Sequence, residues 1–429
     1  MTTQTLGKPA SSMAPLRLPG VHLDWVRPMP ARALASGVPV FVGFVAGTTE
    51  WCAVAFDRWE QFLPVFGDAA LGYLDYAIRG FFENGGSRCW VVALDLPDPS
   101  SAEAMEARLL ACFRAAGPME GLAEPDLVCV PDATWGPLGA DAAAVLAVQR
   151  AVLAYCNRMN DRLAIFDCLP AVTRSPGPQP ESTDLMRARS RIPWLSDIEY
   201  SEPPATGRRH AAPGQVANGA VYWPWIRVAP LARHGHTRVR SVPPCGHVAG
   251  VFARIDASAG RHKAPANEVL AGAFDTDDSA DNDTLADLND DGANSLRVLP
   301  GRGVHVWGAR SLSGLPAWRY VNVRRVVLGL ARWAELGLRD LVMETNQPAL
   351  WERIRQRVGG YCLARYREGA LRGDAPEEAY FVKCDAENNP PESSDQGRVI
   401  CEIGLAITTP AEFIVVRLVQ SVDGTAFAG

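Results

Sequence analysis

Asp132 and the seven histidines are the first side chains to test for catalytic chemistry. Asp132 follows an apolar strand pattern, and active-site groups of parallel sheets collect at such strand ends. The sequence has no Gly-x-Ser-x-Gly nucleophile motif, however, and no serine can be matched with a histidine as its base. We therefore predict no catalytic residues. A hydrolase-like or ligand-binding α/β protein with a pocket at Asp132 is kept as the alternative from another class.

An acidic stretch offers the pattern closest to a metal site. Asp287, Asn289 and Asp291 alternate as in the first half of a calcium-binding loop, where alternating oxygen ligands surround the cation. The twelfth position of such a loop would be Val298, where a bidentate glutamate is required. We therefore predict a solvated acidic loop over residues 276–298 and no metal site.

The remaining glycine-rich motif is Pro300-Gly301-Arg302-Gly303. It is not a phosphate-binding loop, because both the lysine and the following hydroxyl residue of such a loop are missing. The glycines predict a tight turn instead. We expect no nucleotide or other cofactor.

The composition narrows the class of protein. The chain has 429 residues, 48% hydrophobic and 21% charged, which is enough for two or three domains with packed cores. A formal net charge of -6 argues against nucleic acid as a partner. Ten scattered cysteines without a C-x-x-C motif predict buried, reduced thiols. The start lacks a signal-peptide pattern and no apolar run has membrane-spanning length, so we expect a cytoplasmic protein without direct membrane insertion.

Apolar patterning predicts an α/β fold with a second, α+β part near the C-terminus. Predicted strands and helices alternate in the first half of the chain, which implies right-handed crossovers and a parallel sheet. The predicted strands are 38–45, 89–94, 126–132, 163–168, 220–226, 248–254, 341–344, 380–385, 399–407 and 412–420. The predicted helices are a short one beginning at Asp57, then 69–83, 102–116, 141–158, 321–337 and 348–368.

These patterns divide the chain into six segments. They are an N-terminal arm (1–36), the first part of the core (37–95), an α/β domain (96–275) with an exposed excursion (174–209), the acidic loop (276–298), a C-terminal domain (299–408) and a C-terminal strand arm (409–429).

Both ends of the chain carry strand patterns that cannot satisfy their own backbone groups. The first is a lone alternating strand between prolines, and the last is apolar on both faces, so neither suits a free tail. We expect both to add to sheets of neighbouring copies, with pairing inside one subunit as the alternative, and a disordered tail over residues 423–429. The residues that define the two strand faces are Val21, Leu23 and Trp25, and Ile414, Val416 and Leu418.

Several strings of residues occur together in one known family. The strings are FFENGGSRC (81–89), VYWPWI (221–226), KAPANE (263–268), PGRGVHVWGAR (300–310), WRYVNVRR (318–325), NQPALW (346–351), PEEAYFVKCD (376–385), NPPE (389–392) and PAEFI (410–414). In order and spacing they resemble the contractile tail sheath family, which wraps the tubes of contractile phage tails, phage-tail-like particles and extracellular contractile injection systems. The resemblance covers nearly the whole chain and is weakest over residues 97–220.

The resemblance implies a structural protein and not an enzyme. Six copies would form a ring, and rings would stack helically around an inner tube, with baseplate and terminator or cap proteins at the ends. The sheath would be assembled in the cytoplasm and become part of a phage tail or a released injection particle. Contraction would then drive the tube into a target. The α/β domain would have a subtilisin-like topology, and a specialised baseplate-end or distal-end paralogue is the alternative within the family.

The predicted helix over residues 348–368 carries a row of arginines. Arg353, Arg357 and Arg367 fall within about 80° of one another around the helix. A solvated basic face is the plainest interpretation. The resemblance adds another, because family members attach to the tube through a C-terminal-domain helix, which makes these three the candidate tube-facing residues.

Overall fold

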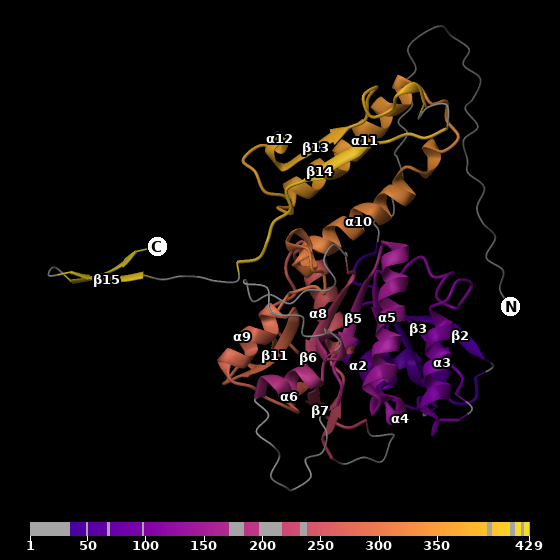
Figure 1. Ribbon diagram of the computed structural model, residues 1–429, viewed down its shortest axis with the longest axis vertical. Helices are drawn as coiled ribbons and strands as arrows, with labels where there is room; N and C mark the ends of the chain where they lie inside the picture. Colours follow the sequence, from indigo (N-terminus) through magenta and orange to yellow (C-terminus); the bar gives the residue numbers. More distant parts are fainter. Residues whose placement is uncertain are drawn as a thin grey trace, which may run out of the picture. The chain divides into compact units, whose positions relative to one another are not determined.

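A nine-stranded mixed sheet forms the centre of the protein (Figure 1). The computed structural model describes residues 35–48, 50–66, 69–96, 98–170, 184–196, 217–231, 238–392, 397–411, 417–421 and 424–428. The strand order is β2-β3-β1-β4-β5-β6-β11-β12-β9. Neighbours from β3 to β11 pair in parallel, whereas β2, β12 and β9 pair antiparallel at the two edges. The predicted mixed α/β fold is confirmed.

The strands of this sheet are short. They are β1 (Pro39–Phe44), β2 (Trp51–Phe56), β3 (Cys89–Leu94), β4 (Leu127–Cys129), β5 (Leu163–Asp167), β6 (Gly219–Trp223), β9 (Glu268–Val269), β11 (Ala293–Leu299) and β12 (Gly303–Val306). Strands β1, β4, β5 and β6 are buried along their whole length, as their continuous apolar sequences require in a sheet covered on both faces. The turn between β11 and β12 has Gly301 and Gly303 at φ 71° and 83°, which confirms the predicted tight turn.

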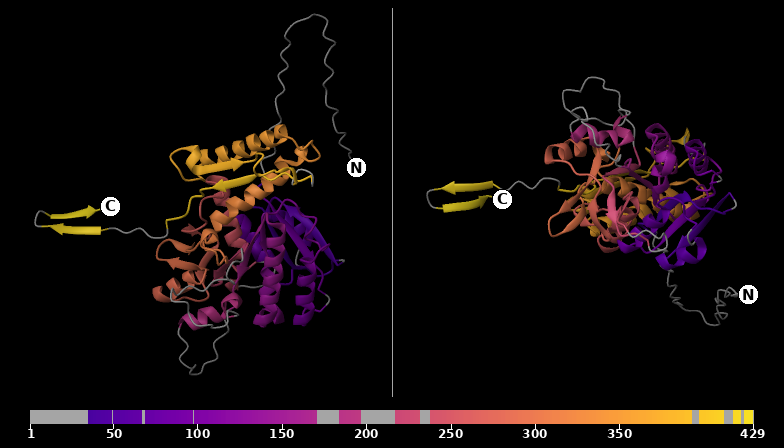
Figure 2. Two further views of the ribbon diagram at one scale, coloured as in Figure 1. Left: turned by 45° about the horizontal axis from the view of Figure 1, so that its top comes forward. Right: turned by 90° about the horizontal axis from the view of Figure 1, so that it is seen from below.

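Helices cover both faces of the sheet (Figure 2). One face packs against the core side chains of α1 (Phe62–Phe66), α2 (Leu74–Glu83) and α8 (Cys245–Ser258). The other packs against α3 (Ala102–Cys112), α4 (Gly136–Gly139), α5 (Ala142–Met159) and α9 (Asn282–Asp290). Two separate hydrophobic cores result, one on each side of the sheet.

The predicted strand over residues 248–254 is wrong, because this segment lies inside α8. An apolar run that is buried on all sides has no periodicity that distinguishes strand from helix. The spacing of two glycines was the available signal. A Cβ on Gly246 would lie 2.2 Å from the carbonyl oxygen of Ala77, and one on Gly250 would lie 2.5 Å from that of Phe81. The glycines, four residues apart, allow α8 to pack closely against α2.

The predicted acidic loop over residues 276–298 is also wrong. It contains α9, whose N-terminal cap is Asp281 accepting a hydrogen bond of 2.8 Å from the Thr284 backbone N–H, and most of β11. The helix forms because Leu288 is buried against the sheet while the carboxylates face outward or pair. Since β11 and β12 belong to the nine-stranded sheet, that sheet crosses the predicted segment boundaries at 95, 275 and 298.

Part of the predicted exposed excursion is packed instead. Its described residues include α6 (Asp184–Ser190) and α7 (Pro193–Ser196). Ala188 of α6 and Ile192, between the two helices, are fully buried. Arg191 pairs with Asp277 at 2.9 Å and with Asp278 at 3.0 Å, so acidic residues from a distant segment neutralise it. The rest of the excursion lies outside the described residues.

The C-terminal part combines two long helices with a two-stranded sheet. Helices α10 (Val321–Gly337) and α11 (Pro348–Arg367) confirm the sequence prediction closely. Strands β13 (Tyr380–Lys383) and β14 (Glu402–Leu405) pair antiparallel and lie along α11, with Leu350, Ile354, Val358 and Cys362 of the helix in the shared core. The predicted strand over residues 341–344 is wrong: a 3-10 turn, η5 (Arg339–Leu341), and a short loop occupy that position.

Two smaller sheets are separate from the nine-stranded sheet and the β13–β14 sheet. Strands β7 (Ile226–Val228), β8 (Arg240–Val242) and β10 (Ala273–Thr276) form a three-stranded sheet. Strands β15 (Arg417–Ser421) and β16 (Gly424–Ala428) form an antiparallel hairpin. In the described ranges, no helix is long and apolar enough to cross a membrane.

Candidate assembly site

The carboxylate of Asp132 is hydrogen-bonded to backbone N–H groups and does not face an open pocket as a catalytic acid would. It lies in a 3-10 turn after β4 and is fully buried, with its two carboxylate oxygens accepting hydrogen bonds from the backbone N–H groups of Phe44 (2.7 Å) and Tyr73 (2.6 Å). Burial raises its pKa to about 7. A Cβ on Gly72 would lie 2.3 Å from the carboxylate, so the chain closes tightly around it. A buried acid that joins two loops in this way has a structural role.

The calcium-like pattern does not form a cation site. Asp287 and Asn289 lie in α9, whose helical geometry spreads the side chains instead of wrapping them around one point. Asp291 is 2.6 Å from the guanidinium of Arg189. Among the described residues, no group of three histidine, cysteine, aspartate or glutamate side chains could hold a metal ion.

A buried ion cluster of Asp126, Asp256 and Arg325 links three elements. Arg325 comes from α10, Asp256 from α8, and Asp126 from the residue before β4. Arg325 Nη1 lies 2.7 Å from Asp256 Oδ1, and its Nη2 lies 3.4 Å from Asp126 Oδ2. All three side chains are at most 5% exposed. Burial alone would raise the pKa of Asp126, but the positive charge of Arg325 and of neighbouring arginines lowers it overall.

The carboxylates of the buried ion cluster also bind residues 36–38, where the chain enters the core. Asp126 accepts hydrogen bonds from the backbone N–H groups of Gly37 (3.1 Å) and Val38 (2.8 Å). The hydroxyl of Ser36 bonds to Asp256. We call residues 36–38 the N-root, because the predicted N-terminal arm precedes them. Charged acceptors make these hydrogen bonds stronger than neutral ones.

Helix α10 also binds Thr408, at the end of the predicted C-terminal domain (299–408). Asn322 of α10 donates from its side-chain amide to the carbonyl oxygens of His262 (2.7 Å) and Thr408 (3.1 Å). Thr408 in turn donates its backbone N–H to the carbonyl oxygen of Ala370 at 3.1 Å. We call Thr408 the C-root. Because Asn322 and Arg325 are three residues apart, they lie one above the other on α10. One turn of that helix therefore contacts the C-root directly and the N-root through the carboxylates of Asp126 and Asp256.

Two further arginines join α10 to the α/β core. Arg332 donates to the carbonyl oxygens of Pro125 (2.7 Å) and Glu124 (2.7 Å), just before Asp126. Arg324 donates to Asn218 (2.5 Å) and Asn160 (2.9 Å). The sequence analysis missed these residues, since it used only the apolar face of the helix. The signal that could have found them is the presence of arginines at positions 324, 325 and 332 within a strongly apolar helix.

The candidate tube-facing arginines divide into two groups. Arg353 pairs with Glu344 at 2.8 Å, and Arg357 pairs with Asp340 at 2.7 Å, so both hold the connection between α10 and α11. Arg367 is exposed and has no ion-pair partner within the described part of the chain. These exposed ion pairs contribute little to stability individually.

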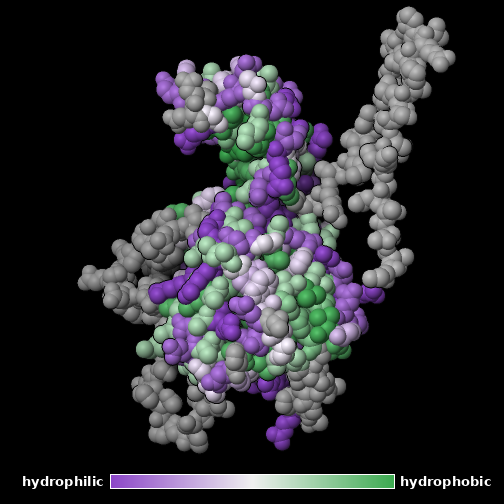
Figure 3. All heavy atoms as spheres, turned by 90° about the vertical axis from the view of Figure 1, so that its right-hand side faces the viewer, coloured by the Kyte–Doolittle hydropathy of each residue, from purple (hydrophilic) through white to green (hydrophobic). Residues whose placement is uncertain are grey.

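The connection that Arg353 and Arg357 hold presents exposed apolar side chains. Leu336, Val342 and Met343 are 51%, 66% and 98% exposed, and Met343 has a φ of 72°, a costly backbone conformation for a residue other than glycine. On the face drawn in Figure 3, hydrophobic residues gather in separate patches among hydrophilic ones. Such a surface suits several small contacts.

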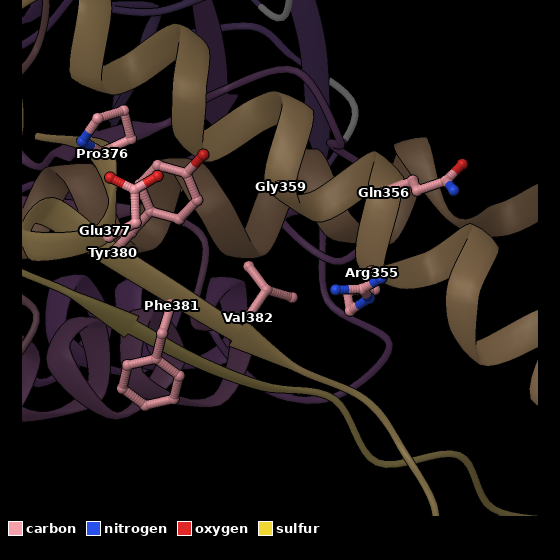
Figure 4. A pocket seen from close by; sticks show the side chains of 8 residues that line it. All are labelled: Arg355, Gln356, Gly359, Pro376, Glu377, Tyr380, Phe381 and Val382. Carbon is pink, nitrogen blue, oxygen red and sulfur yellow. The ribbon is translucent and has the colours of Figure 1, made fainter.

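A groove of about 330 Å³ lies between α11 and β13 (Figure 4). Its lining includes Tyr380, Phe381 and Val382 of β13 and Gly359 of α11. A Cβ on Gly359 or on Gly360 would meet no atom within 4 Å. In the parts of the chain that the structure describes, neither outer edge of the β13–β14 sheet has a partner strand.

The structure tests the predicted terminal strands only in part. Val21, Leu23, Trp25, Ile414 and Val416 lie outside the described residues. Leu418 lies in β15, opposite Phe427 of β16. The prediction of a disordered tail from residue 423 is therefore wrong for residues 424–428, where Thr425 and Phe427 are of types that favour strands and β15 supplies the pairing strand.

Comparison with known families finds two matching models. Residues 203–312 match the phage tail sheath protein central domain, and residues 315–421 match the phage tail sheath C-terminal domain, together half of the chain. The fold and the sequence thus define a structural protein of contractile machines. The chain belongs to the contractile tail sheath family, and its place is that of a sheath subunit.

Solved structures agree with this family. The chain is 26% identical to a protein of the anti-feeding prophage helical sheath in its contracted state, with a TM-score of 0.67 over 94% of this chain and 99% of that one. A protein of the anti-feeding prophage baseplate in its contracted state matches with 24% identity and a TM-score of 0.70, over 95% and 99% of the two chains. A protein of the PVC sheath complex, an extracellular contractile injection system in its contracted state, matches with 24% identity and a TM-score of 0.65, over 96% and 99%. No curated protein sequence matches the chain.

Replacing Arg325 by methionine should destabilise the folded chain by about 3–5 kcal/mol, because two buried carboxylates lose their shared cation. The matched control is Arg355→Met, which removes an exposed arginine 2.6 Å from Glu352 and should cost less than about 1 kcal/mol. Urea unfolding of the dilute full-length chains measures both. Equal losses in the two variants would contradict the role given to the buried ion cluster.

Proposed function

We propose that this chain polymerises as stacked hexameric rings around an inner tube, and that contraction of the polymer drives the tube into a target. The observation that carries the proposal is the joint attachment of the N-root and the C-root to one turn of α10. A subunit that is pulled at both ends needs firm attachment at both roots. Charge-assisted hydrogen bonds to Asp126 and Asp256 hold the N-root, and an amide-to-carbonyl hydrogen bond from Asn322 holds the C-root.

In the proposed assembly, the terminal arms add strands to sheets of neighbouring copies. The two-stranded β13–β14 sheet is the receiver that we propose, because its two edges are open in the described chain and the groove beside β13 leaves room for backbone. Backbone ladders of this kind keep subunits connected while side-chain contacts rearrange. Val21, Leu23 and Trp25 of one copy and Ile414, Val416 and Leu418 of another are the strand faces assigned to these joints.

The tube would be contacted through α11 and the connection that precedes it. Arg367 supplies an unpaired positive charge, whereas Arg353 and Arg357 act by fixing the connection that exposes Val342 and Met343. Weak exposed charge pairs with tube carboxylates can be released at small cost when the sheath widens. Baseplate and terminator or cap proteins are the further partners proposed, without nucleic acid and without direct membrane insertion.

The chain would have no enzymatic activity. Asp132 does not support a hydrolase function, because both of its carboxylate oxygens already accept backbone hydrogen bonds. A place at the baseplate or distal end, and not in the bulk of the sheath, is the alternative within the family. This alternative is supported by the similarity of the chain to a protein of a helical sheath structure and to a protein of a baseplate structure. The particle would be assembled in the cytoplasm and then released or carried as a tail.

Concentrated full-length chain should form hollow striated cylinders in negative-stain electron microscopy. Deleting residues 1–34 or 412–429 should abolish them, because the roots remain but the added strands are lost. Far-ultraviolet circular dichroism should show that the shortened chains keep their fold. A monodisperse monomer that stays monomeric even with a tube protein would overturn the proposal.

Filling the groove beside β13 should block assembly without unfolding the chain. Gly359→Trp places a large side chain in the groove, and the open space around its Cβ means that the fold tolerates it. Gly360→Trp is the matched control, since Gly360 has equal space but does not line the groove. Electron microscopy should show cylinders for the control only; cylinders in both variants would exclude this groove as a strand-binding site.

Reversing the charge of Arg367 should weaken binding to the tube protein of the same particle. Arg367→Glu should lower the affinity by roughly 2- to 5-fold per contact, with most of the difference lost at high salt. Arg302→Glu reverses an exposed arginine in the β11–β12 turn and serves as the control. Co-sedimentation at rising salt measures both, and equal effects would remove Arg367 from the tube-facing surface.

A further inference from the structure

Two cysteines face each other across the β13–β14 sheet. The last pair of the ladder is Lys383 opposite Glu402, so Cys384 and Cys401 occupy the next opposed position. Both point to the face that packs on α11, where they join the same core cluster. Neither cysteine is in a disulfide.

The opposed position is one of the close, non-hydrogen-bonded pairs of an antiparallel ladder. The backbone N–H of Ala406 donates to the carbonyl oxygen of Ala379, and alternation from that pair makes the Cys384–Cys401 position non-hydrogen-bonded. The Cα atoms of such pairs are about 4.5 Å apart, which lies within the range that a disulfide spans. At that spacing, a disulfide would fit the register that the ladder already has.

Asn389 fixes this geometry from the other side. Its side-chain oxygen accepts a hydrogen bond of 2.6 Å from the backbone N–H of Ile400, and its amide donates to the carbonyl oxygens of Ile400 (3.0 Å) and Asp385 (2.9 Å). The same amide nitrogen lies 3.9 Å from the sulfur of Cys384. Asn389 is 2% exposed, so the cysteine pair is held between the last ladder rung and a buried amide bridge.

The pair differs from the other neighbouring cysteines in its accessibility. Cys129 and Cys245 also interact, but both are fully buried between the nine-stranded sheet and α8. Cys384 is 4% exposed and Cys401 is half-buried, so a small oxidant can approach Cys401. Burial raises the pKa of both thiols, that of Cys401 to about 12, which keeps the pair slow to react.

We propose that Cys384 and Cys401 are an oxidisable pair that closes to a cross-strand disulfide when the protein meets a low-molecular-weight disulfide. One cysteine thiolate attacks the oxidant RSSR, forms a mixed disulfide and releases RS⁻. The second thiolate then attacks the mixed disulfide and releases another RS⁻. The two cysteine protons pass to the two RS⁻ groups, so two cysteine thiols and RSSR give one protein disulfide and two RSH.

The disulfide would join β13 to β14 in the register that the ladder already has. In a reducing compartment both thiols stay reduced, and an oxidising medium outside the cell favours closure. The closed pair would resist separation of the two strands. The inference rests on the geometry of the pair and does not depend on the proposed function.

Peptide mapping of the full-length chain tests the proposal directly. The protein is incubated with glutathione disulfide, blocked with N-ethylmaleimide, and digested with trypsin. Cleavage after Lys383, Arg398 and Arg417 places the two cysteines in separate peptides, residues 384–398 and 399–417, each with one cysteine. We expect these peptides to be joined, with a mass two hydrogens below their sum, and the ten titratable thiols to fall by two.

Serine variants distinguish oxidation of this pair from oxidation of other cysteines. Cys384→Ser and Cys401→Ser should each abolish the linked peptides, whereas Cys52→Ser, which removes a half-buried thiol on β2, should leave them unchanged. The oxidised chain should also unfold a few degrees higher than the reduced one, and a reductant should reverse the shift. Alkylation of both cysteines in the wild-type chain after incubation, or linkage of either to another cysteine, would overturn the proposal without reliance on any variant.

Discussion

The charge of Arg325 is the constraint on which the rest of the structure depends. A guanidinium buried to this extent is tolerated only where carboxylates neutralise it, and here Asp126 and Asp256 come from different elements. Their presence therefore ties α10 to α8 and to the start of β4 at one point. Asp126 also accepts the backbone N–H groups of the N-root: Gly37 donates to the oxygen that Arg325 contacts, and Val38 donates to the other oxygen.

Helix α10 joins its neighbours through directional hydrogen bonds as well as through apolar packing. Val321 and Leu328 reach the core beneath the nine-stranded sheet, while Val323 and Val326 pack with Leu371 and Ile407 of the C-terminal part. Apolar packing alone would permit small sliding of such a helix, since it has no direction. The hydrogen bonds of Arg324, Arg325 and Arg332 have direction and fix the position of the helix along its axis.

The sequence predicted the fold best where periodicity was strong. The helices over residues 321–337 and 348–368 and the buried strands β1, β3, β4 and β5 follow from their apolar patterns alone. The failures have a common cause. Residues 248–254 and 276–298 were assigned from composition, apolar in one case and acidic in the other, whereas their structure depends on close packing through Gly246 and Gly250 and on the burial of Leu288.

Site prediction was less complete for a related reason. Arg353, Arg357 and Arg367 all lie on α11, but their angles around the helix could not reveal that Arg353 is paired with Glu344 and Arg357 with Asp340. The buried ion cluster joins residues far apart in the sequence, such as Asp126 and Arg325, and no local pattern contains that pairing. Of the two predicted terminal strands, only residues 417–421 of the second lie in the described chain, where they form β15 and pair with β16.

The closeness of the two roots has a consequence for how the family can vary. Asn322 and Arg325 are separated by a rise of only about 4.5 Å along α10. In the polymer proposed above, tension that enters one end of a subunit would reach the other end through this short stretch of helix and the carboxylates that it contacts. Parts of the α/β layer away from this stretch, such as α6 and α7, could then differ in length between family members without lengthening the connection between successive subunits of that polymer.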